Sequence, residues 1–315
     1  LASVKKFYNV RCPKCRQWAR RETDVCDTFL DSAWYYLRYP SVRDSAHAWN
    51  PVITKKWFPV DMYIGGKEHS VLHLLYVRFL AFAFYDWKMV HFQEPFVKFR
   101  SHGLITKDGA KMSKSRGNVV NPDDYIAAYG ADAMRMYLAF MAPLDQGGDF
   151  RDTGIAGITR FLQRIYRLVI TYKFPNRNLL LNPLDRKNNQ KEITRIMHKT
   201  IKKTTEDIEA LQYNTAISSL MVFLNMLEDN QGQDNQGQTQ ILKIHIKTFL
   251  KLLAPFAPHI TEELWQQYVV INYKPKTKNF RSIHREPWPT FQKKFLHEDT
   301  REFAVQINGK LRDTF

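Results

Sequence analysis

Four cations lie within ten positions of one short segment of this 315-residue chain: Lys107, Lys111, Lys114 and Arg116. Glycine and serine residues among them allow the backbone to approach an anion closely. Lysine suits a leaving pyrophosphate because its ammonium group is a mobile point charge that can follow the oxygens as charge develops. A lysine-rich run is more often a solvated loop, so residue types alone keep both interpretations open.

Two glycines follow a strand-like run, Val60–Ile64, at the kind of edge where open α/β sheets bind ligands. Gly65 and Gly66 would let a nucleotide lie close to the backbone. Glu68 stands at the expected start of a long apolar helix over 68–87, where its carboxylate could accept both hydroxyls of a ribose. We therefore expect a nucleotide site at this edge.

Two histidines, His69 and His73, stand four residues apart in the same segment. On a continuous helix this spacing puts both rings on one face. Such a pair can begin a zinc site, but no third ligand is evident nearby. Ordinary core histidines are the plainer alternative.

Aromatic residues gather between Asp27 and Tyr35, and their types alone favour a core element. The motif Cys12-Pro-Lys-Cys15 is half of a zinc knuckle. A tetrahedral site needs four ligands, and Cys26 is poorly placed to supply one. Cys12 and Cys15 are therefore a candidate half of a zinc site, and no metal is assigned to them.

The residue pattern changes near position 150. Up to about 140, short β-branched or aromatic runs alternate with helical stretches, which predicts an α/β fold. Asn121-Pro122 predicts a helix start and Gly130 its end. From Thr153 to Tyr268 apolar residues recur with a helical period, which predicts a bundle of four or five amphipathic helices.

We expect three parts: an α/β domain over 1–150, a helical bundle over 151–290, and the start of another α/β domain over 291–315. The Asn- and Lys-rich stretch 176–191 and the tandem repeat 229–238 are predicted loops. Thr261 is the predicted N-cap of the last bundle helix, with Glu262 and Glu263 at its positive end. A strand, a turn and a second strand are expected over 303–311.

Three segments resemble one enzyme family. Lys111-Met112-Ser113-Lys114-Ser115 is similar to the KMSKS signature of class I aminoacyl-tRNA synthetases. Asp27–Tyr35 resembles the DTFxDSxWY segment of leucyl-tRNA synthetases, and Gly65–Tyr76 resembles their GGxEHxxxHLLY segment. The likeness to the bacterial and mitochondrial type of leucyl-tRNA synthetase runs from about Arg11 to Leu311. It implies the second half of a Rossmann-type class I catalytic domain, followed by an all-α anticodon-binding-type bundle.

The resemblance also implies roles for single residues. Those matching the family's leucine pocket are Phe29, Ser32, Tyr35, His69 and His73. Those matching its ATP site are Gly65, Gly66, Glu68, Lys111, Met112, Ser113, Lys114 and Ser115. Among these, Lys111 and Lys114 would be the catalytic cations. The implied reaction joins L-leucine and ATP, with Mg²⁺, to give leucyl-adenylate and pyrophosphate, and then passes the leucyl group to tRNA-Leu. Positioning of the substrates and electrostatic stabilisation of the transition state would account for the rate of this reaction.

Composition sets further expectations. Lys and Arg number 47 against 31 Asp and Glu, a net charge of +16, which favours a nucleic-acid partner or the basic proteome of mitochondria. Four lysines of the helical half fit contacts to an RNA backbone: Lys191, Lys199, Lys202 and Lys203. Three cysteines indicate a reducing compartment, and no apolar run fits a bilayer core. We expect a soluble monomer in the mitochondrial matrix, with the bacterial cytoplasm as the alternative.

The chain resembles a segment of the family rather than all of it. A His-Ile-Gly-His-like tetrapeptide and an editing domain have no counterpart here, and both are expected upstream of Leu1. The segment alone is therefore expected to be inactive. A hypothesis of another class is a truncated product that binds RNA without catalysis, which an assay of pyrophosphate exchange would distinguish.

Overall fold

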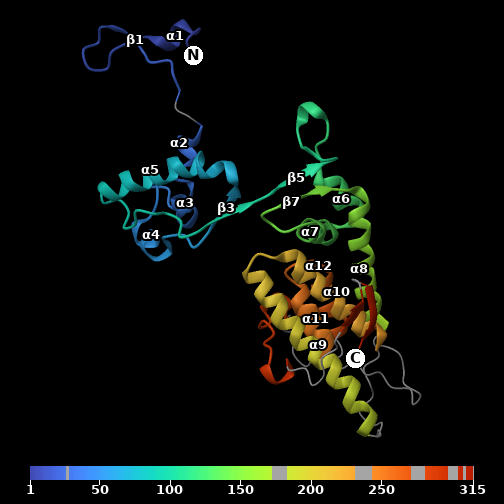
Figure 1. Cartoon of the computed structure of the whole chain (residues 1–315). Helices are drawn as coiled ribbons and strands as arrows, with labels where there is room; N and C mark the ends of the chain where they lie inside the picture. Colours follow the sequence, from blue (N-terminus) through green and yellow to red (C-terminus); the bar gives the residue numbers. More distant parts are fainter. Residues whose placement is uncertain are drawn as a thin grey trace. The chain divides into compact units, whose positions relative to one another are not determined.

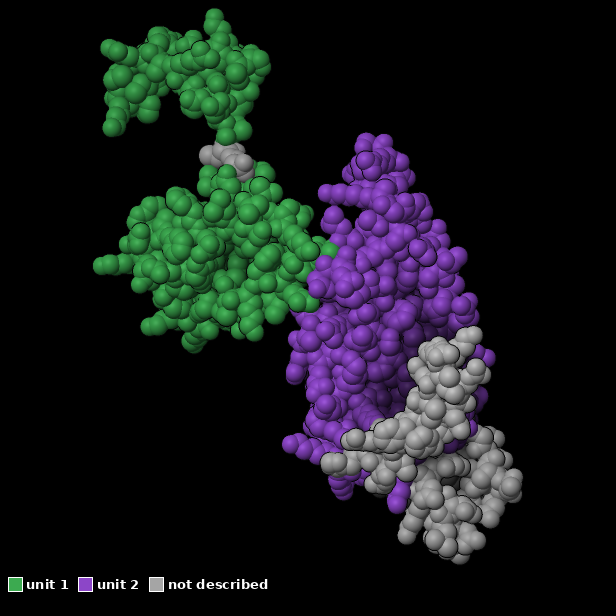
Figure 2. Space-filling view, viewed as in Figure 1, with its two compact units in different colours: residues 1–103 green, residues 104–315 purple. Residues whose placement is uncertain are grey.

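The computed structural model describes residues 1–25, 28–171, 183–230, 243–270, 281–296, 304–307 and 310–314. Contacts divide the chain into two units, Leu1–Gly103 and Leu104–Phe315, which Figure 2 shows in different colours. Each unit is described below by itself.

The first unit holds short helices, a hairpin and one pair of parallel strands (Figure 1). Its elements are α1 Lys5–Tyr8, β1 Asn9–Arg11, β2 Trp18–Arg20, α2 Phe29–Ser32, α3 Tyr35–Arg38, η1 Tyr39–Ser41, α4 Pro51–Trp57, β3 Tyr63–Gly66, η2 Lys67–Ser70, α5 His73–Asp86 and β4 Phe99–His102. Strands β3 and β4 are parallel and α5 lies between them in sequence, so the three form a β-α-β unit, as the α/β pattern predicts.

Two predicted boundaries in this unit are wrong. The predicted strand Val60–Ile64 is displaced: β3 covers Tyr63–Gly66, and Val60 makes only an isolated bridge with Phe96. The predicted helix over 68–87 is also interrupted. Lys67–Ser70 form a 3₁₀ turn, and α5 begins at His73 after Leu72, whose backbone angles (φ −106°, ψ −98°) are not helical. His69 and His73 therefore do not share one helix.

The second unit begins with a three-stranded sheet and continues as helices. Its elements are β5 Leu104–Lys107, β6 Ala110–Lys111, η3 Lys114–Arg116, α6 Pro122–Tyr129, α7 Ala131–Phe140, β7 Gly147–Phe150, α8 Asp152–Thr171, α9 Pro183–Glu209, α10 Tyr213–Asp229, α11 Lys243–Leu253, α12 Pro258–Leu264, the π-helix η4 Trp265–Val270, η5 Ile283–Arg285, η6 Lys293–Phe295, β8 Ala304–Ile307 and β9 Lys310–Thr314.

Strand β5 is the centre of the three-stranded sheet, between antiparallel β6 and parallel β7. Helices α6 and α7 lie between β5 and β7 in sequence, which makes a second β-α-β unit. Gly147 opens β7 at φ +72°, where a Cβ atom would lie 2.1 Å from the Leu104 carbonyl oxygen. Only glycine allows these strands to approach so closely. As predicted, Asn121 caps α6 by accepting from the Asp123 N–H, and Gly130 ends it.

Helices α8 to α11 form the predicted bundle, and α9 contacts both α10 and α11 (Figure 1). Apolar side chains at the predicted helical spacing form its core: Ile165 and Leu168 of α8, Ile193 of α9 and Leu220 of α10 are at most 1% exposed. The predicted loop 176–191 is wrong from Pro183 onward, since α9 starts there. Most of the predicted loop 229–238 lies outside the described residues. The predicted terminal strands are confirmed as β8 and β9, which pair antiparallel.

Across the described ranges, the helices lack the combination of length and apolarity that spanning a bilayer requires.

The bundle core contains a buried histidine that ties stability to pH. His245 on α11 is fully buried, and its Nε2 lies 3.3 Å from the Thr194 hydroxyl of α9. Burial, with a smaller effect from His198, lowers the pKa of His245 to about 4. In an unfolded chain a histidine titrates at about 6.5. Between these values the unfolded state binds more protons, so stability falls as the pH falls from about 6.5 toward 4.

We therefore expect the free energy of unfolding to fall by about 2 kcal/mol more between pH 7 and pH 5 in the wild type than in His245→Gln. Urea titrations followed by circular dichroism at each pH measure this difference. His47→Gln, an exposed histidine of the first unit, is the control and should keep the wild-type profile. Parallel profiles for the wild type and His245→Gln would contradict the assignment.

Candidate functional site

The cation-rich segment is a β-hairpin followed by a short 3₁₀ turn. In the β5–β6 ladder Thr106 pairs with Lys111 and Lys107 pairs with Ala110. The two residues between them, Asp108 and Gly109, both have positive φ, 55° and 70°. Two successive left-handed residues are typical of a type I′ turn, whose twist matches that of the strands it joins.

Beyond the hairpin, the Asn118 side chain closes the loop. Its Oδ1 accepts from the Ser113 N–H at 2.9 Å, and its Nδ2 donates to the Lys111 carbonyl at 3.3 Å. Gly117, at φ +67°, ends the 3₁₀ turn. Met112 packs against the core of the second unit. The loop therefore has a shape that is fixed by its own side chains.

The four cations of this loop differ in their surroundings. The Lys107 ammonium donates to both oxygens of Asp152, at 3.0 and 2.9 Å, so its charge is already neutralised. Lys111, Lys114 and Arg116 are exposed. Within the described ranges no carboxylate pairs with these three. The loop thus presents three cations, rather than four, to an incoming anion.

The five residues matched to the leucine pocket converge around His73. His73 is 8% exposed, its Nε2 lies 3.0 Å from the Ser32 carbonyl oxygen, and its Nδ1 lies 3.1 Å from the Tyr63 hydroxyl. A carbonyl can only accept, so Nε2 carries a hydrogen and donates it to Ser32, while the Tyr63 hydroxyl is the hydrogen-bond partner of Nδ1. His73 thereby connects α2, β3 and α5.

Aromatic rings surround this histidine. The Phe29 ring centroid lies 5.7 Å from that of His73 and 6.2 Å from that of His69, and the Tyr35 centroid lies 5.8 Å from that of His73. His69 also has a buried Nδ1 with no hydrogen-bond partner among the described residues. Burial raises the pKa of Tyr35 to about 12, so its phenol stays neutral. The cluster is an apolar surface with a few fixed polar atoms, which suits a small amphipathic ligand.

Tyr63 and Tyr76 belong to this cluster, and the residue patterns did not single them out. The Tyr76 ring centroid lies 6.1 Å from that of Phe29. Tyr63 precedes Gly65 by two positions on β3, so both face the same side of the strand. A Cβ atom at Gly65 would lie 3.0 Å from the Tyr63 ring. The spacing Tyr-x-Gly in a strand was the signal that could have identified Tyr63.

The two glycines expected to admit a nucleotide are buried in β3. A Cβ atom at Gly66 would lie 2.5 Å from a carboxylate oxygen of Glu68. The carboxylate of Glu68 therefore occupies the space beside Gly66, at the end of β3. The space that Gly66 leaves open is thus filled by Glu68 in this structure, and the close approach of a nucleotide to this glycine stays a prediction.

One cavity lies near the cluster. Its volume is about 630 Å³, and it contacts the cluster only through Tyr35 and Tyr63. Its other walls are mostly apolar and aromatic, including Tyr39, Trp57 and Phe96. A larger cavity of the second unit, about 830 Å³, contains none of the predicted site residues.

Cys12 and Cys15 lie in the turn between β1 and β2. The Cys12 N–H donates to the Gln17 carbonyl and the Arg16 N–H to the Cys12 carbonyl. Backbone N–H groups, first that of Cys15, lower the pKa of the Cys12 thiol. The residues described for this chain contain no group of three or more metal ligands, and Cys26 lies outside them. Two thiols do not complete a tetrahedral zinc site.

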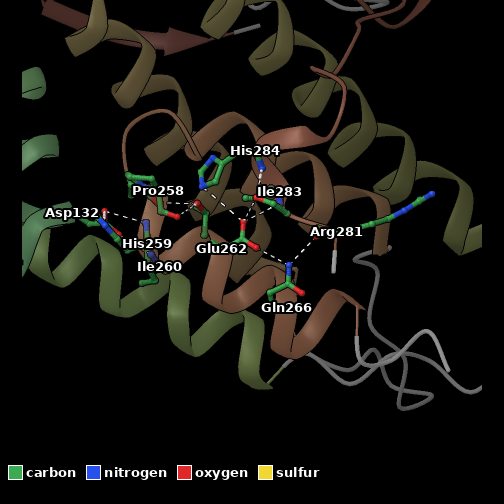
Figure 3. Close-up of polar contacts among 12 residues, drawn as sticks. Asp132, Pro258, His259, Ile260, Glu262, Gln266, Arg281, Ile283 and His284 are labelled. Carbon is green, nitrogen blue, oxygen red and sulfur yellow. Dashed lines mark hydrogen bonds and ion pairs between the residues drawn. The ribbon is translucent and has the colours of Figure 1, made fainter. Parts of the chain in front are cut away.

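The bundle corner at α12 is built differently from the prediction (Figure 3). The helix starts at Pro258, and Thr261 lies inside it, donating to the Ala257 carbonyl. The predicted N-cap is therefore wrong. The α12 N–H groups are instead satisfied by Asp132 of α7, which accepts from the N–H of Ile260 at 2.7 Å and of His259 at 3.3 Å. The His259 ring also donates Nδ1–H to Asp132 at 2.9 Å.

Glu262 is likewise not at the helix start. Its carboxylate accepts from the Ser282 hydroxyl at 2.7 Å and the Ile283 N–H at 3.0 Å (Figure 3). It therefore holds Ser282 and Ile283, at the start of η5, against α12. Of the lysines expected to contact RNA, Lys202 pairs with Glu206 and Lys203 pairs with Asp207, so their charges are partly compensated within α9.

Comparisons with known proteins define the class. Residues 4–150 match the family of class I tRNA synthetases for Ile, Leu, Met and Val, and residues 190–315 match the anticodon-binding domain of tRNA ligases. A methionyl-tRNA synthetase of Mycobacterium tuberculosis, solved with methionyl-adenylate, shares the fold over 82% of this chain and 52% of its own (TM-score 0.56, 16% identity). The chain belongs to the class I tRNA synthetases.

Within this class the chain is similar to leucine–tRNA ligases. Those of Clostridium botulinum and Clostridium perfringens are 43% and 42% identical to it over 99% of its length. The LeuRS of Agrobacterium radiobacter K84, solved as a ternary complex with tRNA and LeuAMS, matches 100% of this chain and 40% of its own, with a TM-score of 0.78 and 33% identity. The chain spans 37% of the length of the clostridial relatives.

The cap that Asp132 provides leads to a stability prediction. Asp132→Ala should lower the free energy of unfolding by about 2 kcal/mol, because two backbone N–H groups lose a charged acceptor. Asp132→Asn keeps an acceptor oxygen and should lose less. Asp145→Ala, an exposed carboxylate on the turn before β7, should stay within about 0.5 kcal/mol of the wild type in the same urea titrations. Equal stabilities for Asp132→Ala and Asp145→Ala would argue against the cap.

Proposed function

We propose that this chain is the part of a leucine–tRNA ligase that carries one side of the leucine and ATP sites and a tRNA-binding bundle. The complete enzyme would join L-leucine to ATP, releasing pyrophosphate, and pass the leucyl group to tRNA-Leu. The observation that carries the proposal is the convergence of Phe29, Ser32, Tyr35 and His69 on His73. The names of the relatives and the tRNA and LeuAMS in the solved complex support it.

The pocket would recognise leucine by shape and by a few fixed dipoles. The half-buried rings of Phe29 and Tyr35 offer the apolar surface that an isobutyl side chain needs. His73, hydrogen-bonded at both ring nitrogens and packed against both rings, would keep these rings in place. His69, with its unpaired Nδ1, is the group of the cluster best able to bind a polar atom of the ligand.

Each unit would supply its own contacts to ATP. Glu68, beside Gly66, would accept the ribose hydroxyls, and the loop of Lys111, Met112, Ser113, Lys114 and Ser115 would lie along the triphosphate. As the leucine carboxylate attacks the α-phosphorus, charge moves onto the leaving pyrophosphate, where exposed lysines stabilise it most. Mg²⁺ would accompany ATP as its counterion.

The remaining expectations belong to the same proposal. The domains would be 1–150, 151–290 and 291–315, and the enzyme would be a monomer. Basic side chains of the bundle would contact the tRNA backbone. The clostridial relatives favour the bacterial cytoplasm, the alternative location, and the mitochondrial matrix stays a prediction.

The leucine pocket can be tested by comparing the KM for leucine with the KM for ATP in a variant of the pocket. In the complete enzyme, His69→Ala should raise the KM for leucine by about tenfold or more and leave that for ATP nearly unchanged, because pocket contacts discriminate by this order. Steady-state pyrophosphate exchange measures both values. His47→Ala, an exposed histidine outside the cluster, is the matched control. Equal changes in both KM values would show that His69 does not line the leucine pocket.

The phosphate loop can be tested through Lys114. Lys114→Ala in the complete enzyme should lower the rate of adenylate formation by about 10²–10³, the typical cost of removing one preorganised charge-stabilising group. Leucine affinity and transfer from preformed adenylate should survive. Lys114→Arg should restore part of the rate, since a planar guanidinium replaces a point charge. Lys55→Ala on α4 is the control. Near-normal pyrophosphate exchange in Lys114→Ala would refute the role of this loop.

A further inference from the structure

The turn of the phosphate loop is held from outside by a carboxylate 40 residues later in the chain. Oδ1 of Asp149, on β7, accepts from the Gly109 N–H at 2.9 Å and from the Thr106 hydroxyl at 3.0 Å. Gly109 is the second residue of the type I′ turn, so this bond reaches the tip of the hairpin. The Gly109 N–H is also the leading cause of the lowered pKa of Asp149.

The register of the sheet links this carboxylate to a candidate catalytic lysine. Thr106 pairs with Asp149 across β5 and β7 and with Lys111 across β5 and β6. Asp149, Thr106 and Lys111 therefore form one row across three strands, and in-register neighbours present their side chains on the same face. Any shift of Thr106 or of the turn would move the strand that ends at Lys111.

A second contact fixes the end of β5, next to the turn. Asp152, the first residue of α8, accepts from the Lys107 ammonium and from the Tyr125 hydroxyl of α6. The Lys107 ammonium also lies 5.4 Å from the centroid of the Phe150 ring. This contact holds Lys107, the last residue of β5, whereas the Asp149 carboxylate bonds to Gly109 within the turn itself.

The ion pair with Arg151 does not explain why an aspartate stands at position 149. Arg151 lies 3.5 Å from Oδ2, but its side chain is 76% exposed, and exposed ion pairs contribute little. The hydrogen bonds to Gly109 and Thr106 are charge-assisted and join two strands, so they are the contacts that matter here.

We propose that Asp149 is a positioning residue for the phosphate loop. Its carboxylate fixes the β5–β6 turn and, through the register of the sheet, helps to set the position of Lys111 and of the loop that follows it. The inference rests on the proposed function, which gives the loop its ligand. Asp149 would thus affect the rate of adenylate formation although it contacts neither leucine nor ATP.

The test measures the loop and the reaction separately in the complete enzyme. Hydrogen exchange followed by mass spectrometry reports on the amides of residues 108–112, and pyrophosphate exchange gives kcat and the KM for leucine. Asp149→Ala should speed amide exchange about 10-fold, the order expected for losing hydrogen bonds to a charged group. The kcat should fall about 10- to 100-fold, the cost of a small misplacement of catalytic groups. The KM for leucine should not change.

Three further variants exclude a general loss of structure. Asp149→Asn keeps the acceptor oxygen and loses the charge, so it should restore both readouts to within about threefold of the wild type. Thr106→Val removes one donor while keeping the shape, and should shift both readouts in the same direction as Asp149→Ala but less. Asp145→Ala removes an exposed carboxylate nearby and should change neither.

Two results would overturn the proposal: unchanged amide exchange in Asp149→Ala, or faster exchange with an unchanged kcat. A fall in kcat that Asp149→Asn does not restore at all would also overturn it, since that variant keeps an acceptor oxygen for the Gly109 N–H and the Thr106 hydroxyl. The proposed function fails on a different measurement, pyrophosphate exchange by Lys114→Ala, and amide exchange at 108–112 would still show whether Asp149 holds the turn.

Discussion

The first unit depends on one imidazole. His73 donates to a backbone carbonyl of α2 and is hydrogen-bonded to a tyrosine hydroxyl of β3, while its own backbone begins α5. A ring held at both nitrogens has little freedom to turn. Because the elements it joins carry Phe29, Tyr35 and Tyr63, the position of His73 sets the positions of the aromatic surfaces. Specificity of the proposed pocket would follow from this single bridging group.

In the second unit, carboxylates connect separate elements by hydrogen bonds, as His73 does in the first unit. Asp132 satisfies the N–H groups of a helix more than a hundred residues later, and Asp149 and Asp152 hold the hairpin at its turn and at the strand residue that precedes the turn. In each case an acceptor from one element satisfies donors that another element leaves unpaired. Backbone N–H groups at helix starts and turns require such partners when they are shielded from water. The chain thus keeps a cation-rich loop in a defined shape although its own charges repel each other.

Local rules account for much of the fold. Asn121 and Gly130 bound α6 as their types predict, and the apolar stripes of α8 to α11 form the core of the bundle. The errors have local causes too. The apolar run after Glu68 is typical of one long helix, yet the backbone at Leu72 leaves the helical region and α5 starts only at His73. At the bundle corner, Thr261 has the side chain of an N-cap, but Pro258 already starts the helix because Asp132 supplies the missing acceptor.

What the sequence determined by itself was residue identity and short-range pattern: the KMSKS-like order at Lys111–Ser115, the histidine segment, the amphipathic stripes and the turn residues. These depend on neighbours within a few positions, so they are visible along the chain. Only the tertiary structure decided which groups meet. That Lys107 is neutralised by Asp152, that Tyr63 bonds to His73, and that Asp149 holds Gly109 are contacts across 10 to 45 positions. Spacing along a chain does not encode such distances, because they arise only when strands pair and helices pack.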